Sequence, residues 1–75
     1  MINEDANYSN LFGKNLLRFR TMKGLSLRQL AILAEMEHHQ ILKIEKGGDL
    51  RLSSIYKLAK ALDVAPQAFF EDHNE

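Results

Sequence analysis

The apolar residues of this chain recur at helical spacing, in short segments separated by residues that end helices. Phe12, Leu16 and Phe19, for example, lie four and three positions apart, which places them on one face of a helix. No stretch alternates apolar and polar residues, and β-branched residues are few, so nothing in the sequence favours a strand. The breaks between segments fall at Gly24, at Gly47 and Gly48, and before the single proline, Pro66. The pattern predicts an all-α fold.

Residues that cap helices stand where these segments begin and end. Ser9 or Asn10 can cap the first helix and Ser26 the second, because a short polar side chain accepts a hydrogen bond from a first-turn amide. Gly24 can take the left-handed conformation that closes a helix. We expect a compact five-helix bundle over residues 9–71, between flexible acidic tails at 1–8 and 72–75. Its helices are expected at about 10–23, 27–34, 37–46, 53–62 and 66–71.

Each expected helix carries a stripe of residues for a shared core. Gly13 interrupts the first stripe and is expected only to weaken the first turn of its helix modestly. In the following helices, apolar or small residues again recur three or four positions apart. The predicted core of these helices consists of Leu30, Ala31, Ala34, Ile41, Ile44, Ile55, Leu58, Ala59 and Leu62.

Size and composition limit what the chain can be. Its 75 residues suffice for one domain with a thin core, and without cysteine no disulfide or thiolate metal site can support it. The absence of cysteine fits a reducing cytoplasm, and we expect that location. Neither a signal peptide nor an apolar stretch of about 18 residues is present, so no membrane association is expected.

Charge is unevenly distributed, although the formal net charge is zero. All ten lysines and arginines lie between Lys14 and Lys60 with only four acids, so this segment carries a net +6. The other six acids lie near the two ends. A basic body of this kind can bind phosphate on one face, or it can be an ordinary solvated surface.

Residues at fixed spacings connect the chain to a known family. The segment from Leu11 to Phe70, about four-fifths of the chain, resembles the phage-repressor and Cro-type helix-turn-helix family. The resemblance implies a lambda-repressor-like fold and a transcriptional regulator that binds double-stranded DNA, usually as a homodimer. It rests on Arg20, on Gly24-Leu25-Ser26, on Leu30-Ala31, on Ile41, Ile44, Glu45 and Gly47, and on the segment from Leu58 to Val64.

The helix expected at 37–46 would then enter the major groove, held by Ile41 and Ile44 on its inner side. The family resemblance implies base contacts from His38, His39 and Lys43, and Gln40 could bridge to a base or a phosphate. The expected phosphate contacts are Arg28, Lys46, the backbone amides of Gly47 and Gly48, and Arg51, the two arginines having the alternative of solvated surface charges. Arg20 and Glu45 match a family pair, which we interpret as a partly buried structural ion pair.

Several positions depart from the family. Leu27 stands where glutamine often contacts the DNA backbone, and Glu35 replaces a turn glycine. Leu50 stands where a proline is often found. Glu37 opens the third helix in place of a small hydroxyl residue, where its charge suits the helix dipole better than it suits nearby phosphate. These departures leave the fold intact but reduce the expected strength of DNA binding.

The adjacent histidines allow other interpretations. They can be plain polar surface, or one can pack against Leu42. A metal site is disfavoured, because neighbouring side chains on a helix point about 100° apart and no third ligand is evident. We expect no metal and no cofactor.

The function has two rivals. An enzyme is disfavoured because the chain lacks a cysteine nucleophile, a phosphate loop and room for a catalytic pocket. A protein-interaction or antitoxin-type module on the same fold remains open. For a homodimer, Phe69 and Phe70 are the expected interface, with one of them in the core; both being core residues is the alternative. No small-molecule ligand domain is expected.

Overall fold

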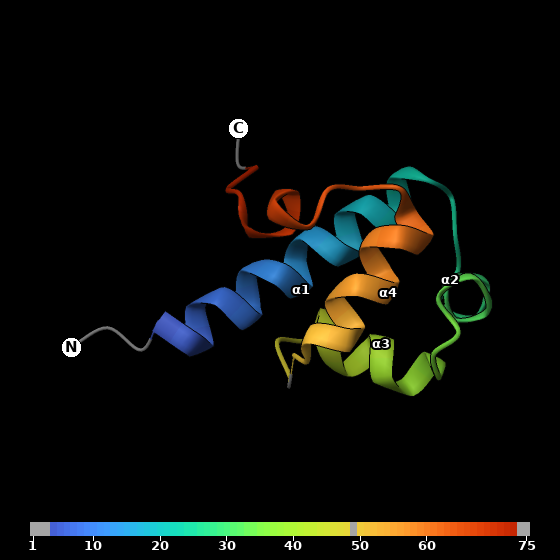
Figure 1. Cartoon of the computed structure of the whole chain (residues 1–75), viewed down its shortest axis with the longest axis horizontal. Coiled ribbons are helices and arrows are strands. Elements are labelled where there is room, and N and C mark those ends of the chain that lie inside the picture. The colour runs from blue at the N-terminus through green and yellow to red at the C-terminus, as the bar shows by residue number, and fades with distance from the viewer. Residues whose placement is uncertain (1–3, 49, 74–75) are drawn as a thin grey trace.

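The computed structural model describes residues 4–48 and 50–73, which form four α-helices and one short 3₁₀ helix. The helices are α1 (Glu4–Met22), α2 (Leu27–Ala34), α3 (His38–Glu45) and α4 (Leu52–Leu62), followed by the 3₁₀ helix η1 (Pro66–Phe70). No strand occurs in the described ranges, so the predicted all-α class is confirmed. Figure 1 shows α1 as the long axis of the molecule, with α4 crossing in front of it and α3 below.

The prediction of five α-helices is wrong in its last member. In η1 the amide of Ala68 donates to the carbonyl of Ala65, three residues back, which is the 3₁₀ pattern. Pro66 lacks an amide hydrogen, and five residues are too few to nucleate an α-helix. The segment therefore closes the bundle as a single tight turn of chain.

The first helix begins earlier than expected. The structure has α1 starting at Glu4, so Ser9 and Asn10 lie inside the helix and do not cap it. No glycine or proline precedes Gly13 to stop the helix. The predicted flexible tail at 1–8 is therefore corrected over 4–8, and residues 1–3 lie outside the described part of the chain. Figure 1 shows the first turns of α1 extending beyond the rest of the bundle.

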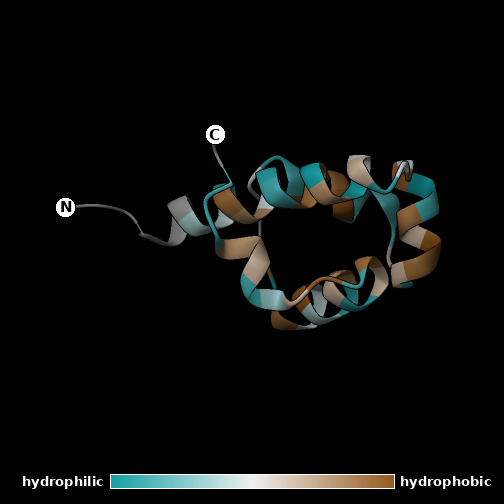
Figure 2. Ribbon diagram, turned by 90° about the horizontal axis from the view of Figure 1, so that it is seen from above, coloured by the Kyte–Doolittle hydropathy of each residue, from teal (hydrophilic) through white to brown (hydrophobic). Residues whose placement is uncertain are grey.

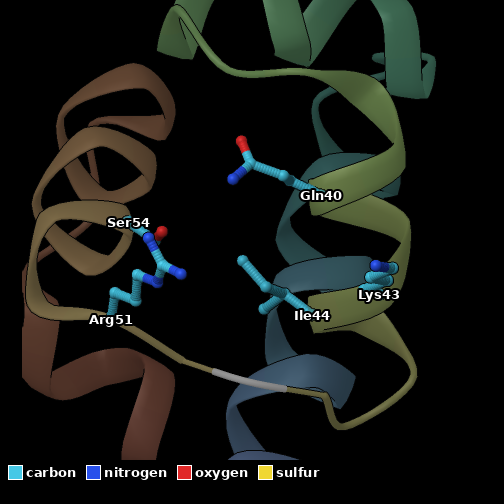
Figure 3. A pocket seen from close by; sticks show the side chains of 5 residues that line it. All are labelled: Gln40, Lys43, Ile44, Arg51 and Ser54. Atoms are coloured by element: carbon cyan, nitrogen blue, oxygen red, sulfur yellow. The ribbon is translucent and has the colours of Figure 1, made fainter.

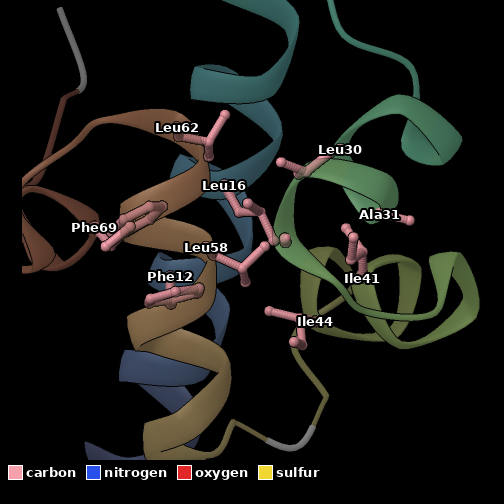
Figure 4. Packing of buried hydrophobic residues seen from close by; sticks show 11 residues of the cluster. Phe12, Leu16, Leu30, Ala31, Ile41, Ile44, Leu58, Leu62 and Phe69 are labelled. Carbon is pink, nitrogen blue, oxygen red and sulfur yellow. The ribbon is translucent and has the colours of Figure 1, made fainter.

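The core collects the apolar face of every element. The buried side chains come from α1, α2, α3, α4 and η1, and Figure 4 shows them gathered between these elements. The ring of Phe69 stacks on Phe12, with centroids 4.5 Å apart, and meets the edge of Phe19 at 5.3 Å. Figure 2 shows each helix banded with apolar and polar residues, as expected where one side of a helix is buried. The fully buried large side chains are Phe12, Leu16, Leu30, Ile41, Leu58, Leu62 and Phe69.

Two residues of α1 connect it to other parts of the fold. A β-carbon at Gly13 would overlap the carbonyl oxygen of Ile44 and lie 2.8 Å from that of Glu45, so glycine permits the close approach of α1 and α3. Asn15 is buried and donates to the carbonyls of Phe69 and Glu71, at 2.6 and 2.8 Å. Sequence reasoning gave Gly13 only a small local effect and did not single out Asn15.

The turn between α2 and α3 sets the direction of the third helix. Ser26 caps α2 as predicted, and Gln29 completes a reciprocal capping box with it. At the other end of α2, Glu35 adopts the left-handed conformation with φ of 55°. The residue that replaces the usual turn glycine therefore keeps the glycine conformation, at some cost in strain.

Candidate nucleic-acid interface

The inner side of α3 is fixed by packing and by one ion pair. Ile41 and Ile44 are buried in the core. Arg20 on α1 donates to both carboxylate oxygens of Glu45, at 2.6 and 3.2 Å, and to the carbonyl of Leu25 at 2.8 Å. Only 13% of the arginine side chain and 6% of the glutamate side chain are exposed. The structure therefore contains the predicted Arg20–Glu45 pair, which joins α1, the loop before α2 and the end of α3.

The outer side of α3 is polar and faces away from the core. His39, Gln40 and Lys43 are exposed and His38 is half-buried. The rings of His38 and His39 lie close, with centroids 4.2 Å apart and planes tilted by 34°. We expected these neighbouring side chains to point about 100° apart on the helix. The short distance between the rings shows that this expectation is wrong, because the two side chains bend toward each other. Glu37 occupies the N-cap position, but its side chain makes no capping hydrogen bond.

A depression of about 150 Å³ separates α3 from the beginning of α4, and Figure 3 shows its walls. Gln40 and Lys43 line it from α3, and Arg51 and Ser54 line it from α4. Arg51 is also the N-cap of α4, and its own side chain makes no capping bond to that helix. Two cations beside the start of a helix give this depression the chemistry that favours an anion.

The other predicted phosphate contacts are distributed differently. Arg28 is exposed on the first turn of α2 and lines a shallow depression together with His38. Lys46 is exposed at the far end of α3. The amides of Gly47 and Gly48 already donate to the carbonyls of α3 residues, at 2.9 and 2.8 Å. The two glycines therefore close α3, and the prediction that their amides are available to phosphate is corrected.

Comparison with known proteins identifies the family. The family model described as helix-turn-helix (HTH_3) matches residues 16–69, which contain all of α2, α3 and α4. The chain belongs to the helix-turn-helix family. This is a family of DNA-binding transcription regulators and not a class of enzymes.

Individual relatives agree with that membership. The chain is 34% identical over 67 residues to an uncharacterized HTH-type transcriptional regulator from Rickettsia conorii, covering 88% of this chain and 54% of that protein. It therefore spans about half the length of this curated relative. The restriction-modification controller protein C.AhdI from Aeromonas hydrophila is 38% identical, with a TM-score of 0.79 over 83% of this chain and 96% of that one. An HTH_3 family transcriptional regulator from Vibrio cholerae is 27% identical, with a TM-score of 0.83 over 88% and 38% of the two chains.

The two residues of the predicted dimer interface lie outside the helix-turn-helix unit, in η1. Phe69 is fully buried within one chain, so the prediction that it contacts a second copy is corrected. Phe70 is half-buried, with its ring 5.4 Å from that of Phe12 and 6.2 Å from that of Tyr8. Its place in an interface remains a prediction.

The described residues also bear on metal binding and on membrane insertion. No group of three or more histidine, cysteine, aspartate or glutamate side chains there is arranged to hold a metal ion. Among the same residues, none of the helices has both the length and the apolar content needed to cross a membrane.

Proposed function

We propose that the chain is a sequence-specific regulator of transcription that inserts α3 into the major groove of double-stranded DNA, in the cytoplasm. The observation that carries the proposal is the division of α3 into two sides. Ile41, Ile44 and the Arg20–Glu45 pair hold the inner side, while the outer side offers His39, Gln40 and Lys43 to a ligand. A helix held in this way fits the major groove, which is about 12 Å wide.

The outer residues have the chemistry for reading bases. Gln40 can bind adenine with one donor and one acceptor, and Lys43 can donate to guanine, each worth about 1–3 kcal/mol of discrimination. His38 and His39 can donate to base or phosphate oxygens. Arg51, across the depression from Lys43, is placed to bind the phosphate that flanks the groove.

Phosphate contacts would also come from the two ends of the unit. Arg28 lies on the first turn of α2, and Lys46 lies at the end of α3. Because cationic side chains contact phosphate without reading sequence, these two residues would fix position and add salt dependence. Glu37 is exposed and lines the same depression as Arg28 and His38, and its charge opposes phosphate. We therefore propose that the affinity of the chain for DNA is moderate.

The homodimer that we include in this proposal needs a surface, and α4 offers one. Tyr56 is 64% exposed and stands between two shallow depressions, which also share Lys60. One of them is completed by Asp63, Val64 and Pro66. Lys60 and Asp63 carry opposite charges three positions apart, so a two-fold axis through this face would bring each against its opposite on the second copy.

Sedimentation distinguishes this surface from Phe70. We expect Tyr56→Glu to shift the chain toward monomer and Phe70→Asp to leave dimerisation in place, because the ring of Phe70 packs within its own chain. Helical content measured by circular dichroism checks that each variant is folded. A dimer that survives Tyr56→Glu and dissociates with Phe70→Asp would restore the interface expected from the sequence. Bound recognition helices would then be about 34 Å apart.

The experiment that tests the function is selection of bound duplexes from a random DNA pool, followed by salt titration on the enriched sequence. Enrichment of one motif supports the proposal. For a protein that makes several phosphate contacts, affinity should also fall steeply as salt rises. A chain that enriches no sequence and binds duplex without salt dependence contradicts it.

One observation favours a second candidate, a protein-interaction module of the antitoxin type. Ile32 and Leu33 of α2 are 77% and 55% exposed, which is unusual for aliphatic side chains next to each other. An apolar partner surface predicts binding that changes little with salt, so the same titration separates the two candidates.

A further inference from the structure

The close approach of two histidine rings is a feature that DNA reading alone does not require. His38 and His39 are neighbours at the beginning of α3, yet their ring centroids are 4.2 Å apart. Histidine is the one side chain whose unperturbed titration changes its charge between pH 5 and 8. The third histidine, His73, is remote from α3. It approaches the carbonyl of Ala68 at 2.9 Å and the ring of Phe19.

Two imidazole rings this close do not bind protons independently of each other. Two positive charges at that separation repel each other, so the first proton binds more readily than a second.

Charged groups of both signs surround the pair. Arg28 of α2 and Glu37 line the same depression as His38, and Lys43 lies one turn along α3 from His39. The positive end of the α3 dipole also faces the pair.

Duplex DNA would add negative charge beside these groups. Phosphates next to Arg28 and Lys43 neutralise their charge and favour an additional cation beside them. A neutral imidazole has one donor and one acceptor, whereas an imidazolium has two donors. Phosphate oxygens and the guanine N7 and O6 atoms are all acceptors, so the protonated ring makes the better contact.

We propose that binding of duplex DNA by α3 is coupled to the uptake of one proton by the His38–His39 pair, so that affinity rises as the pH falls. The inference rests on the proposed function. The sign follows from linkage, because the state that holds more protons is favoured at lower pH. The DNA-bound chain would therefore hold more protons than the free chain.

The first test measures affinity for a labelled 30-base-pair duplex of mixed sequence, from pH 5.5 to 8.0 at constant ionic strength. One proton changes the dissociation constant by at most about tenfold per pH unit, so we expect binding to be about fivefold tighter at pH 6 than at pH 8. The double variant His38→Gln, His39→Gln keeps polar side chains that do not titrate, and its ratio between the two pH values should approach one. His73→Gln is the matched control and should keep the ratio of the unaltered chain.

The second test does not depend on how well any variant binds. Ring-proton NMR signals of the unaltered chain report the protonation of each histidine directly. At pH 7, adding the duplex should move the signals of His38 or His39 toward those of imidazolium, with those of His73 unchanged. Affinity that is independent of pH, or ring signals that report no protonation, overturns the coupling while leaving the proposed function in place. A chain that binds no duplex at any pH overturns both.

Discussion

The inner side of α3 is mainly apolar and packs against the core, whereas the outer side is polar and exposed to solvent. The inner side consists of Ile41, Ile44 and Glu45, which are held by the core and by Arg20. The outer side carries His39 and Lys43, which are exposed. Within this eight-residue helix, the inner side fixes the position of α3 in the fold, and the outer side carries the polar groups that can contact a ligand. A change on the inner side should therefore affect stability and DNA binding together, and a change on the outer side should affect DNA binding alone.

The largest effect is expected at the inner side, from Glu45→Ala. The substitution leaves the charge of Arg20 mostly buried, with the carbonyl of Leu25 as its remaining hydrogen-bond partner among the described residues. Removing one member of a buried pair typically destabilises a protein by about 3 kcal/mol or more. We expect the melting temperature to fall well below that of the unaltered chain, and duplex binding to weaken because α3 loses its anchor.

The matched control is Glu37→Ala, which removes the same charge from the outer end of α3. Glu37 is exposed and its side chain makes no capping bond, so its loss should change stability by no more than about 0.5 kcal/mol. Equal melting temperatures for the two variants would break the comparison between the sides, because the ion pair would then contribute nothing to the anchoring of α3.

A somewhat smaller loss of stability is expected from Gly13→Ala in α1, the helix against which the inner side of α3 packs. The added methyl group would meet the backbone carbonyls of Ile44 and Glu45, which cannot move as a flexible side chain can. Overpacking of this kind costs about 1–3 kcal/mol, although alanine is the better helix former. Thermal unfolding measures the effect, and a variant as stable as the unaltered chain would mean that α1 and α3 can separate freely.

Most of the inner side could be predicted from the sequence. Spacings of three and four place Ile41, Ile44 and Leu58 on buried faces whatever the rest of the fold does, and Ser26 and Gly24 mark helix ends by local chemistry alone. The bounds of α2 agree with the expected 27–34 for the same reason.

Features that depend on partners distant in sequence could not be predicted in this way. Asn15 donates to residues 54 and 56 positions away, and nothing around it in the sequence indicates a buried amide. The space around Gly13 depends on how closely α3 crosses α1. The free surface of Phe70 depends on whether Tyr8 is helical, which the expected start of α1 missed. The roles proposed for the outer side rest on exposure and chemistry, and DNA binding has to test them.

On the outer side, Lys43→Ala should weaken duplex binding by about tenfold and leave stability nearly unchanged. The expected loss corresponds to the lower part of the 1–3 kcal/mol that a good base contact provides. Lys43 is exposed and, among the described residues, lines the depression opposite Arg51 without an ion pair of its own. The dissociation constant and the melting temperature are measured on the same preparation. Lys14→Ala, an exposed lysine on α1, is the control that should change neither. A fall in melting temperature as large as that of Glu45→Ala would mean that the two sides of α3 are not separable.

The smallest effect is expected at the turn that leads into α3, and its sign is positive. Glu35 has φ of 55°, a conformation that costs a residue with a β-carbon about 1 kcal/mol and glycine nothing. Glu35→Gly should therefore raise the free energy of unfolding by up to about 1 kcal/mol. Glu35→Gln removes the charge and keeps the β-carbon, so it should leave stability unchanged while improving DNA affinity as much as the glycine variant does. If both variants were equally stable, charge rather than backbone conformation would be the cost at this position, and the turn would belong with the outer side of α3.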